Sequence, residues 1–241
     1  FILLTGSPAL PPVEASDVII VAAVVAALAG ILDAFYTFPL YIQFLYRAVI
    51  AVLTGWFLLN PTHEYLHEGA NGFILLAVFV VVAFAVWRAM SYGHDHRGAK
   101  NSFTLLVLLA MATMSMMMAG SLKFGQMTVT LTAAVGASWV VALIRPRYSL
   151  APGGIGAAAI MYTGLLFGAH YYAELPLTAM ILLLIAVLPP AMARATKLKH
   201  RIGELPTLGI VIAAIVILAG LAFFFTFQSS PPLEPYDPYN Y

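Results

Sequence analysis

The sequence predicts an all-α, polytopic integral membrane protein with about eight transmembrane helices. Two observations support this fold class. Of the 241 residues, 62% are apolar and only 9% are charged, whereas a soluble domain carries about a quarter charged residues. The apolar residues also form long stretches, each close to the roughly 20 residues that a helix needs to cross the hydrocarbon. These two observations exclude a soluble globular enzyme.

Each apolar stretch is expected to be helical, because a chain in lipid must satisfy its backbone hydrogen bonds within itself. In chain order the stretches are 18–32, 40–59, 72–90, 103–119, 127–144, 155–173, 177–195 and 207–227. The first is the shortest, and its helix could continue past Asp33 to Phe38.

The breaks between these stretches contain the residues that most often end helices. In chain order the breaks fall at Pro39, Asn60 with Pro61, Gly93, Gly120, Pro146 with 152–154, Pro176, and Gly203 with Pro206. Because the connections are short, neighbouring helices are expected to be antiparallel.

The basic residues predict the orientation of this bundle. With eight helices, ten of the eleven fall on one side of the membrane, and only Lys123 falls on the other. The ten are Arg47, Arg88, Arg97, Lys100, Arg145, Arg147, Arg194, Lys197, Lys199 and Arg201. Since cytoplasmic loops are enriched in Lys and Arg, these loops are expected to be cytoplasmic and both numbered ends to lie outside. The first residue is Phe1, so residues 1–4 could end a removed signal peptide or an earlier helix.

A weak internal repeat is present at a spacing of roughly 105 residues. The matching pairs are 58–65 with 165–172, 96–98 with 200–203, and 26–30 with 133–137. A four-plus-four duplication would divide the chain into an outer segment 1–17, helices in 18–119, helices in 120–227 and a tail 228–241. The two halves would have the same orientation. Shared composition of apolar helices is the alternative explanation.

The string His63-Glu64-Tyr65-Leu66-His67 matches the pattern H-E-x-x-H. On a helix its two His share one face and can bind zinc, while the Glu acts as a general base. The third ligand would come from His170 or Glu174, which the topology places on the same outer side. A catalytic role for Glu64 is therefore one hypothesis.

Two alternatives to a zinc enzyme remain for these outer residues. The same His could hold a haem or a non-catalytic metal, since paired imidazoles are common haem ligands in membranes. The string also follows Asn60 and Pro61 in a short loop, and Glu68 continues it, which is typical of a solvated turn. The plain hydrophilic turn is the favoured interpretation.

A methionine run lies in the fourth stretch. Its members are Met111, Met114, Met116, Met117 and Met118, with Met127 opening the next stretch. Thioethers suit Cu(I), and Met114 and Met118 lie one helical turn apart near the outer end. Met also fills irregular gaps between packed helices, and this packing role is favoured.

Ionisable residues are nearly missing from the middle of the predicted helices. Asp33 and Arg47 lie toward the inner ends of the first two, where they could pair. Because charged groups in lipid persist mainly for function, a proton- or sodium-coupled pump is hard to build from this chain, although uniport is not excluded. The hydroxyls of stretches four and five predict hydrogen bonds between helices rather than a pore.

Two inner features have ordinary explanations. The string His94-Asp95-His96-Arg97 favours a solvated loop, because residues two apart diverge on a helix. An aromatic set around the first inner turn is typical of an interfacial belt, or could receive a partner subunit or a ring-shaped pigment. Its members are Phe35, Tyr36, Phe38, Tyr41, Phe44 and Tyr46.

The C-terminal tail, 229–241, contains four prolines and three tyrosines. It is expected to be extended and polyproline-like, and to lie along a partner through Pro235, Tyr236, Tyr239 and Tyr241.

Several classes of function are excluded or unsupported. Eleven basic against ten acidic residues make no nucleic-acid footprint, and zero Cys removes thiolate metal sites and Cys nucleophiles. No P-loop, dinucleotide turn or nucleophile elbow is present. The favoured hypothesis is a non-catalytic membrane subunit that scaffolds or completes a larger assembly, with other membrane subunits or further copies of itself as partners. The alternatives are a transporter or channel for a small solute or metal ion, and a membrane metalloenzyme or haem protein, with zinc, copper or haem as the possible cofactor.

Overall fold

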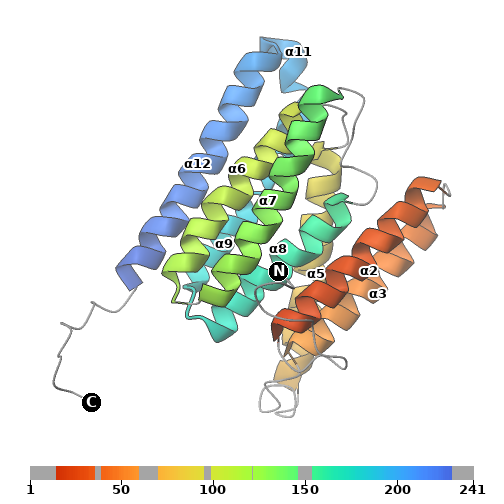
Figure 1. Cartoon of the computed structure of the whole chain (residues 1–241), viewed down its shortest axis with the longest axis vertical. Helices are drawn as coiled ribbons and strands as arrows, with labels where there is room; N and C mark the ends of the chain where they lie inside the picture. Colours follow the sequence, from red (N-terminus) through yellow and green to blue (C-terminus); the bar gives the residue numbers. More distant parts are fainter. Residues whose placement is uncertain are drawn as a thin grey trace.

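The computed structural model of the protein describes residues 15–35, 39–59, 70–94, 99–120, 122–145 and 154–229. The regular secondary structure in these residues is entirely helical, which confirms the predicted all-α class (Figure 1). The helices are α2 Ala15–Phe35, α3 Leu40–Leu59, α5 Ala70–His94, α6 Ala99–Met118, α7 Leu122–Ile144, α8 Gly154–Tyr172, α9 Leu177–Ile185, α10 Leu188–Ala195, α11 Leu198–Ile202 and α12 Glu204–Ser229.

Five segments are long and apolar enough to cross a membrane: Tyr41–Leu59, Gly72–Tyr92, Leu122–Ile144, Leu177–Ala195 and Glu204–Ser229. More than half of each remains unburied within the protein, so their outer faces are left to contact lipid. The chain is therefore a multi-pass membrane protein. Asp17–Ala29 and Ser102–Met118 are shorter apolar helical segments in the same bundle.

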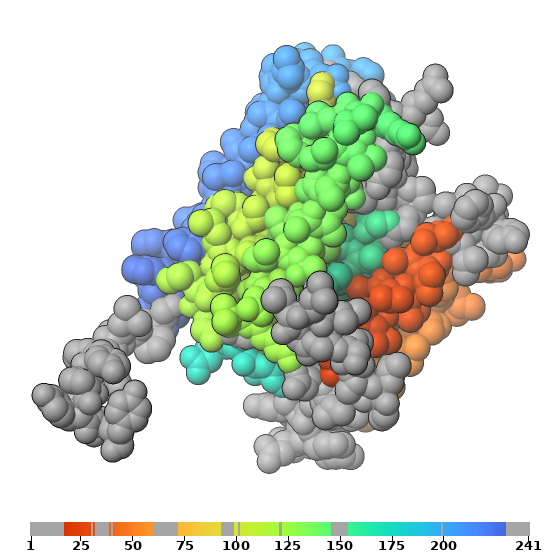
Figure 2. All heavy atoms as spheres, in the orientation of Figure 1, coloured from red at the N-terminus to blue at the C-terminus, as the bar shows by residue number. Residues whose placement is uncertain are grey.

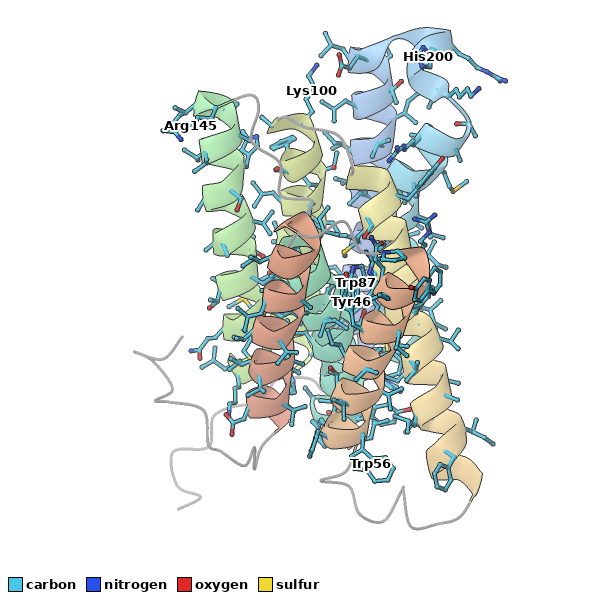
Figure 3. All side chains as sticks on the ribbon, turned by 90° about the vertical axis from the view of Figure 1, so that its right-hand side faces the viewer. Tyr46, Trp56, Trp87, Lys100, Arg145 and His200 are labelled. Atoms are coloured by element: carbon cyan, nitrogen blue, oxygen red, sulfur yellow. The ribbon has the colours of Figure 1, made fainter. Side chains whose placement is uncertain are left out.

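Consecutive long helices run in opposite directions (Figure 1). Figure 3 places Lys100, Arg145 and His200 at one end of the bundle, which we call the basic end, and Trp56 at the opposite end. At the basic end, Lys100 Nζ at the start of α6 lies 3.3 Å from a carboxylate oxygen of Glu204 at the start of α12. This ion pair shows that α6 and α12 begin side by side.

Helix α8 is the centre of the bundle. It is buried along most of its length and packs against α2, α5 and α7. In Figure 2 it is visible on the facing side in a strip between α7 and α2 and at the end where it meets α9. Small residues are required because neighbouring side chains lie close to its backbone. A Cβ at Gly156 would lie 2.6 Å from Trp87 of α5, and one at Gly168 would lie 2.6 Å from Phe124 of α7.

Helices α6 and α7 are joined by polar contacts. The hydroxyls of Thr113 and Thr132 lie 3.2 Å apart, and the Thr128 hydroxyl oxygen lies 2.9 Å from the sulfur of Met116. These contacts between the helices agree with the predicted interhelical role of the hydroxyls. Each of the three threonine hydroxyls also lies 2.8 Å from a carbonyl of its own helix. Thr130 and Ser138 likewise donate to carbonyls of α7 itself.

The predicted helix 177–195 is broken into α9 and α10 at Ala186 and Val187. Pro189 and Pro190 follow the break, and neither has an N–H to donate to the preceding turn. The amide of Val187 bonds to Leu184 O at 3.3 Å instead of reaching Leu183 O. The Leu183 carbonyl therefore needs another donor, and the fully buried Tyr162 of α8 provides it.

Candidate functional site

The end of the bundle opposite the basic end holds one predicted ligand, His170, in the last turn of α8. Its ring is half-buried, and Nδ1 lies 2.7 Å from Leu175 O. A carbonyl only accepts, so the Nδ1–H of His170 donates this hydrogen bond. Metal-binding His residues commonly make this contact to a backbone carbonyl, which orients the ring.

Glu174 lies beyond the end of this helix. The amides of Ala173 and Leu175 both bond to Ala169 O at 3.0 Å, which closes the last turn of α8. Between them Glu174 is exposed and has φ 57°, the left-handed conformation that usually belongs to Gly at such a position. His170 and Glu174 therefore do not share a helix face, although they are four residues apart.

A hydrogen bond joins α8 to α3, the helix that precedes the other predicted ligands in the chain. The Tyr172 hydroxyl donates to Leu58 O at 2.7 Å, which joins the last turns of the two helices. His63, Glu64 and His67 follow α3 in the chain but lie outside the described residues. No group of three His, Asp or Glu that could hold a metal occurs within the described ranges. Of the four predicted metal ligands, His170 and Glu174 are therefore the two that the structure describes.

The methionines of α6 divide into two groups. Met116 is fully buried, as is Met127 of α7, and Met117 lies against Gly125, where an added Cβ would be 2.6 Å from its side chain. These positions confirm the packing role. Met114 and Met118 are 54% and 37% exposed on the outer surface of α6. A Cu(I) site at these two residues stays a prediction.

Arg47 of α3 lies inside a membrane-spanning segment, beside aromatic rings. Its guanidinium carbon is 5.2 Å from the ring centre of Trp87 and 5.9 Å from that of Tyr46. The two rings lie edge to face with centres 6.4 Å apart, between the two ends of the bundle (Figure 3). The sequence predicted Asp33 as a partner of Arg47, but the Asp33 side chain is not among those that the structure describes. The contact with Trp87 was missed because the two residues lie on different helices.

The predicted aromatic belt is only partly described. Tyr41 is 71% exposed, as expected for an interfacial residue. Phe44 is also exposed, and its ring packs against that of Phe84 of α5, with ring centres 4.9 Å apart. The structure does not describe the side chains of Phe35, Tyr36 and Phe38.

At the basic end, three residues that sequence analysis did not combine come together. The guanidinium carbons of Arg88 and Arg194 lie 5.9 Å and 4.5 Å from the ring centre of Tyr92. Arg194 also donates through Nη1 to the backbone carbonyl of Tyr92. Arg88 and Tyr92 are one turn apart on α5, but Arg194 comes from α10, about a hundred residues later. No local signal relates them.

Two other sequence predictions fall largely outside the described residues. His94 is the last residue of α5, while 95–97 of the inner string are not described. The tail residues Pro235, Tyr236, Tyr239 and Tyr241 are likewise outside the described part of the chain.

The chain matches no protein-family model, no curated protein and no solved structure. Its function is therefore inferred from its own chemistry and geometry.

Proposed function

We propose that the chain is a non-catalytic, multi-pass membrane subunit that completes a larger membrane assembly. One observation carries this proposal: apart from the largely apolar rings of Trp87 and Tyr162, every buried side chain among the described residues that has a polar group is a Ser or Thr. They are Thr54, Ser102, Thr104, Thr113, Ser115, Thr128, Thr163 and Thr226. A core built in this way has no buried carboxylate, amine or imidazole in the described part to act as an acid, base or ion ligand.

The bonding of these hydroxyls supports a structural role. Five of them donate to a carbonyl four residues earlier in their own helix, at 2.7 to 2.9 Å. Such bonds satisfy the hydroxyl locally in an apolar setting and leave it no proton to relay. The hydroxyl of Ser115 is fully buried and has no hydrogen-bond partner within the described ranges.

The experiment is to isolate the chain gently from its native membrane and measure the mass of the particle by native mass spectrometry. We expect a particle larger than one chain, which loses its partner when Tyr236 and Tyr239 are both changed to Ala. Tyr41→Ala, which changes an exposed tyrosine of α3, is the matched control and should leave the particle intact. A lone monomer in the native membrane would overturn the proposal.

We also propose that α2, α6 and α8 cross the bilayer together with the five long apolar segments, which makes eight passes. Their 19 to 21 residues correspond to about 30 Å of helix, the thickness of the hydrocarbon. The basic end would then be cytoplasmic and both numbered ends outside. Single-Cys labelling from each side of the membrane tests this, because the chain has no Cys of its own.

The four-plus-four duplication has weaker support. It pairs α3 with α8, yet α8 is central and buried, whereas α3 exposes Tyr41, Leu45 and Leu53 by more than half. Two halves related by a twofold axis would bury the paired helices to similar extents. The duplication therefore rests on the three sequence matches.

A second candidate function is transport of a small neutral solute, and the break between α9 and α10 favours it. Interrupted helices of this kind line substrate paths in many transporters. Solute uptake into proteoliposomes tests it, with Pro189→Ala and Pro190→Ala together as the variant that restores a regular helix. If solute uptake were the same in that variant as in the wild type, the break between α9 and α10 would not be needed for transport.

The orientation of the His170 ring favours a third candidate, a metal or haem protein. His63 follows Leu58 by five residues, which span at most about 18 Å, so the chain is long enough for His63 to reach the α8 end. Metal analysis and visible absorption of the purified protein test this candidate. We expect bound metal or a haem band that is lost in His170→Ala, and a metal-free, colourless protein would overturn it.

A further inference from the structure

A cluster of two arginines around one tyrosine ring lies at the basic end. Arg88 and Tyr92 belong to the last turns of α5, and Arg194 belongs to the last turn of α10. Their guanidinium carbons are 5.9 Å and 4.5 Å from the centre of the Tyr92 ring. Two positive charges from two different helices are therefore held beside the same ring.

The depth of this cluster in the membrane follows from where the apolar segments of its helices end. The apolar segment of α5 ends at Tyr92, and the segment that contains α10 ends at Ala195. Tyr and Arg at the end of an apolar segment lie at the depth of the lipid headgroups, with the ring toward the acyl chains and the charge toward water. The cluster is thus positioned against phosphate groups of the lipid leaflet.

Arg194 is held in place before any ligand binds. Its Nη1 donates to the Tyr92 carbonyl at the end of α5, and its plane lies near the Tyr92 ring. A guanidinium has five N–H donors in a fixed planar arrangement, and this one bond orients all of them. Arg88, in contrast, is exposed and contacts the ring from the same helix. One arginine is fixed and the other can adjust.

The surroundings add further positive charge. Lys197 and Arg201 are exposed in the turn from α10 through α11 to α12, and Arg145 is exposed at the end of α7. Glu204, a carboxylate described at this end, pairs with Lys100. The resulting field attracts anions to this end of the bundle.

We propose that Arg88, Tyr92 and Arg194 form a binding site for the phosphate of an anionic lipid headgroup. Guanidinium groups bind phosphate oxygens through paired, charge-assisted hydrogen bonds. A phosphate between the two arginines would also relieve the repulsion between their charges, while the acyl chains extend along α5 and α10 beside Tyr92. Free phosphate offers the same oxygens, but it lacks the chains that would contact the apolar segments.

The test compares lipids by native mass spectrometry of the full chain in a mild detergent. The probes are dioleoylphosphatidylglycerol, dioleoylphosphatidylcholine and inorganic phosphate at matched concentrations. We expect the chain to bind dioleoylphosphatidylglycerol in preference to dioleoylphosphatidylcholine. The affinity for dioleoylphosphatidylglycerol should fall about tenfold in Arg88→Gln and in Arg194→Gln, because each variant loses charge-assisted hydrogen bonds. Arg145→Gln, a basic residue of the same end but outside the cluster, is the matched control and should bind like the wild type.

Several results would overturn the proposal. Equal binding of the two lipids would exclude a site that recognises the headgroup. If Arg145→Gln lost as much affinity as the two cluster variants, the preference would come from the overall positive charge of this end and not from the cluster. Displacement of the lipid by inorganic phosphate at equal concentration would indicate a free-phosphate site instead. Arg88 is exposed, so Arg88→Gln leaves the core intact and decides the question even if Arg194→Gln fails to fold.

Discussion

The hydroxyl of Tyr162 on α8 donates a hydrogen bond to the carbonyl of Leu183 on α9, across 2.7 Å. This bond links the central helix of the bundle to the one broken helix among the predicted spans. It satisfies a carbonyl that the break removes from the regular helical pattern.

Tyr162→Phe should lower the free energy of unfolding by about 1–3 kcal/mol, because it leaves a buried carbonyl without a donor. The measurement is thermal unfolding of the purified protein in mild detergent. Tyr41→Phe, at an exposed tyrosine, is the control and should change the melting temperature little. Equal stability of Tyr162→Phe and the wild type would mean that the Leu183 carbonyl finds another donor.

Gly156→Ala should destabilise the protein by about 1–3 kcal/mol, because the new methyl group would lie 2.6 Å from the Trp87 ring and force α5 and α8 apart. Gly220 of α12 is the matched control, since a Cβ there would meet nothing within 4 Å. Gly220→Ala should be neutral or stabilising by up to about 1 kcal/mol, because Ala is the better helix former. Similar melting temperatures for the two variants would contradict the close contact.

Glu174→Gly should stabilise the protein by about 1 kcal/mol, because the left-handed backbone at φ 57° disfavours any side chain. Glu174→Ala removes the same carboxylate but keeps the strain, so it should show no such gain. Thermal unfolding of both variants separates backbone strain from charge. A loss of stability in Glu174→Gly would indicate that the carboxylate makes a favourable contact in the folded protein.

The ion pair between Lys100 and Glu204 should contribute at most about 1 kcal/mol, because both side chains are about half exposed. A double-mutant cycle with Lys100→Gln and Glu204→Gln measures this coupling energy. The coupling should fall further as salt is raised from 0.05 to about 0.5 M, since screening weakens exposed pairs. A larger coupling that persists in high salt would mean that the pair is shielded from water.

The sequence predicted the fold class and most helix positions, because both depend on local properties. Long apolar stretches and the Pro and Gly residues between them indicated helices close to the observed α3, α5, α7 and α12. The break between α9 and α10 was not predicted, although Pro189 and Pro190 were visible in the sequence. An apolar segment alone does not indicate whether a neighbouring side chain, here Tyr162, will satisfy the carbonyls that a break frees.

For the candidate sites, the sequence identified residue types but not their neighbours. His170 was selected as a ligand, but its bond to Leu175 O and the left-handed backbone of Glu174 depend on where α8 ends. Two arginine contacts each join residues of different helices. Arg194 of α10 meets Tyr92 of α5, beside Arg88, and Arg47 of α3 meets Trp87 of α5.

The sequence by itself determined that this is a multi-pass helical membrane protein, since apolar length and helix-breaking residues act locally along the chain. Only the tertiary structure decided that α8 is the buried centre and that two arginines meet over Tyr92. The physical reason is that lipid-facing and protein-facing helices have similar apolar compositions, so their relative positions depend on close packing between small and large side chains far apart in the sequence.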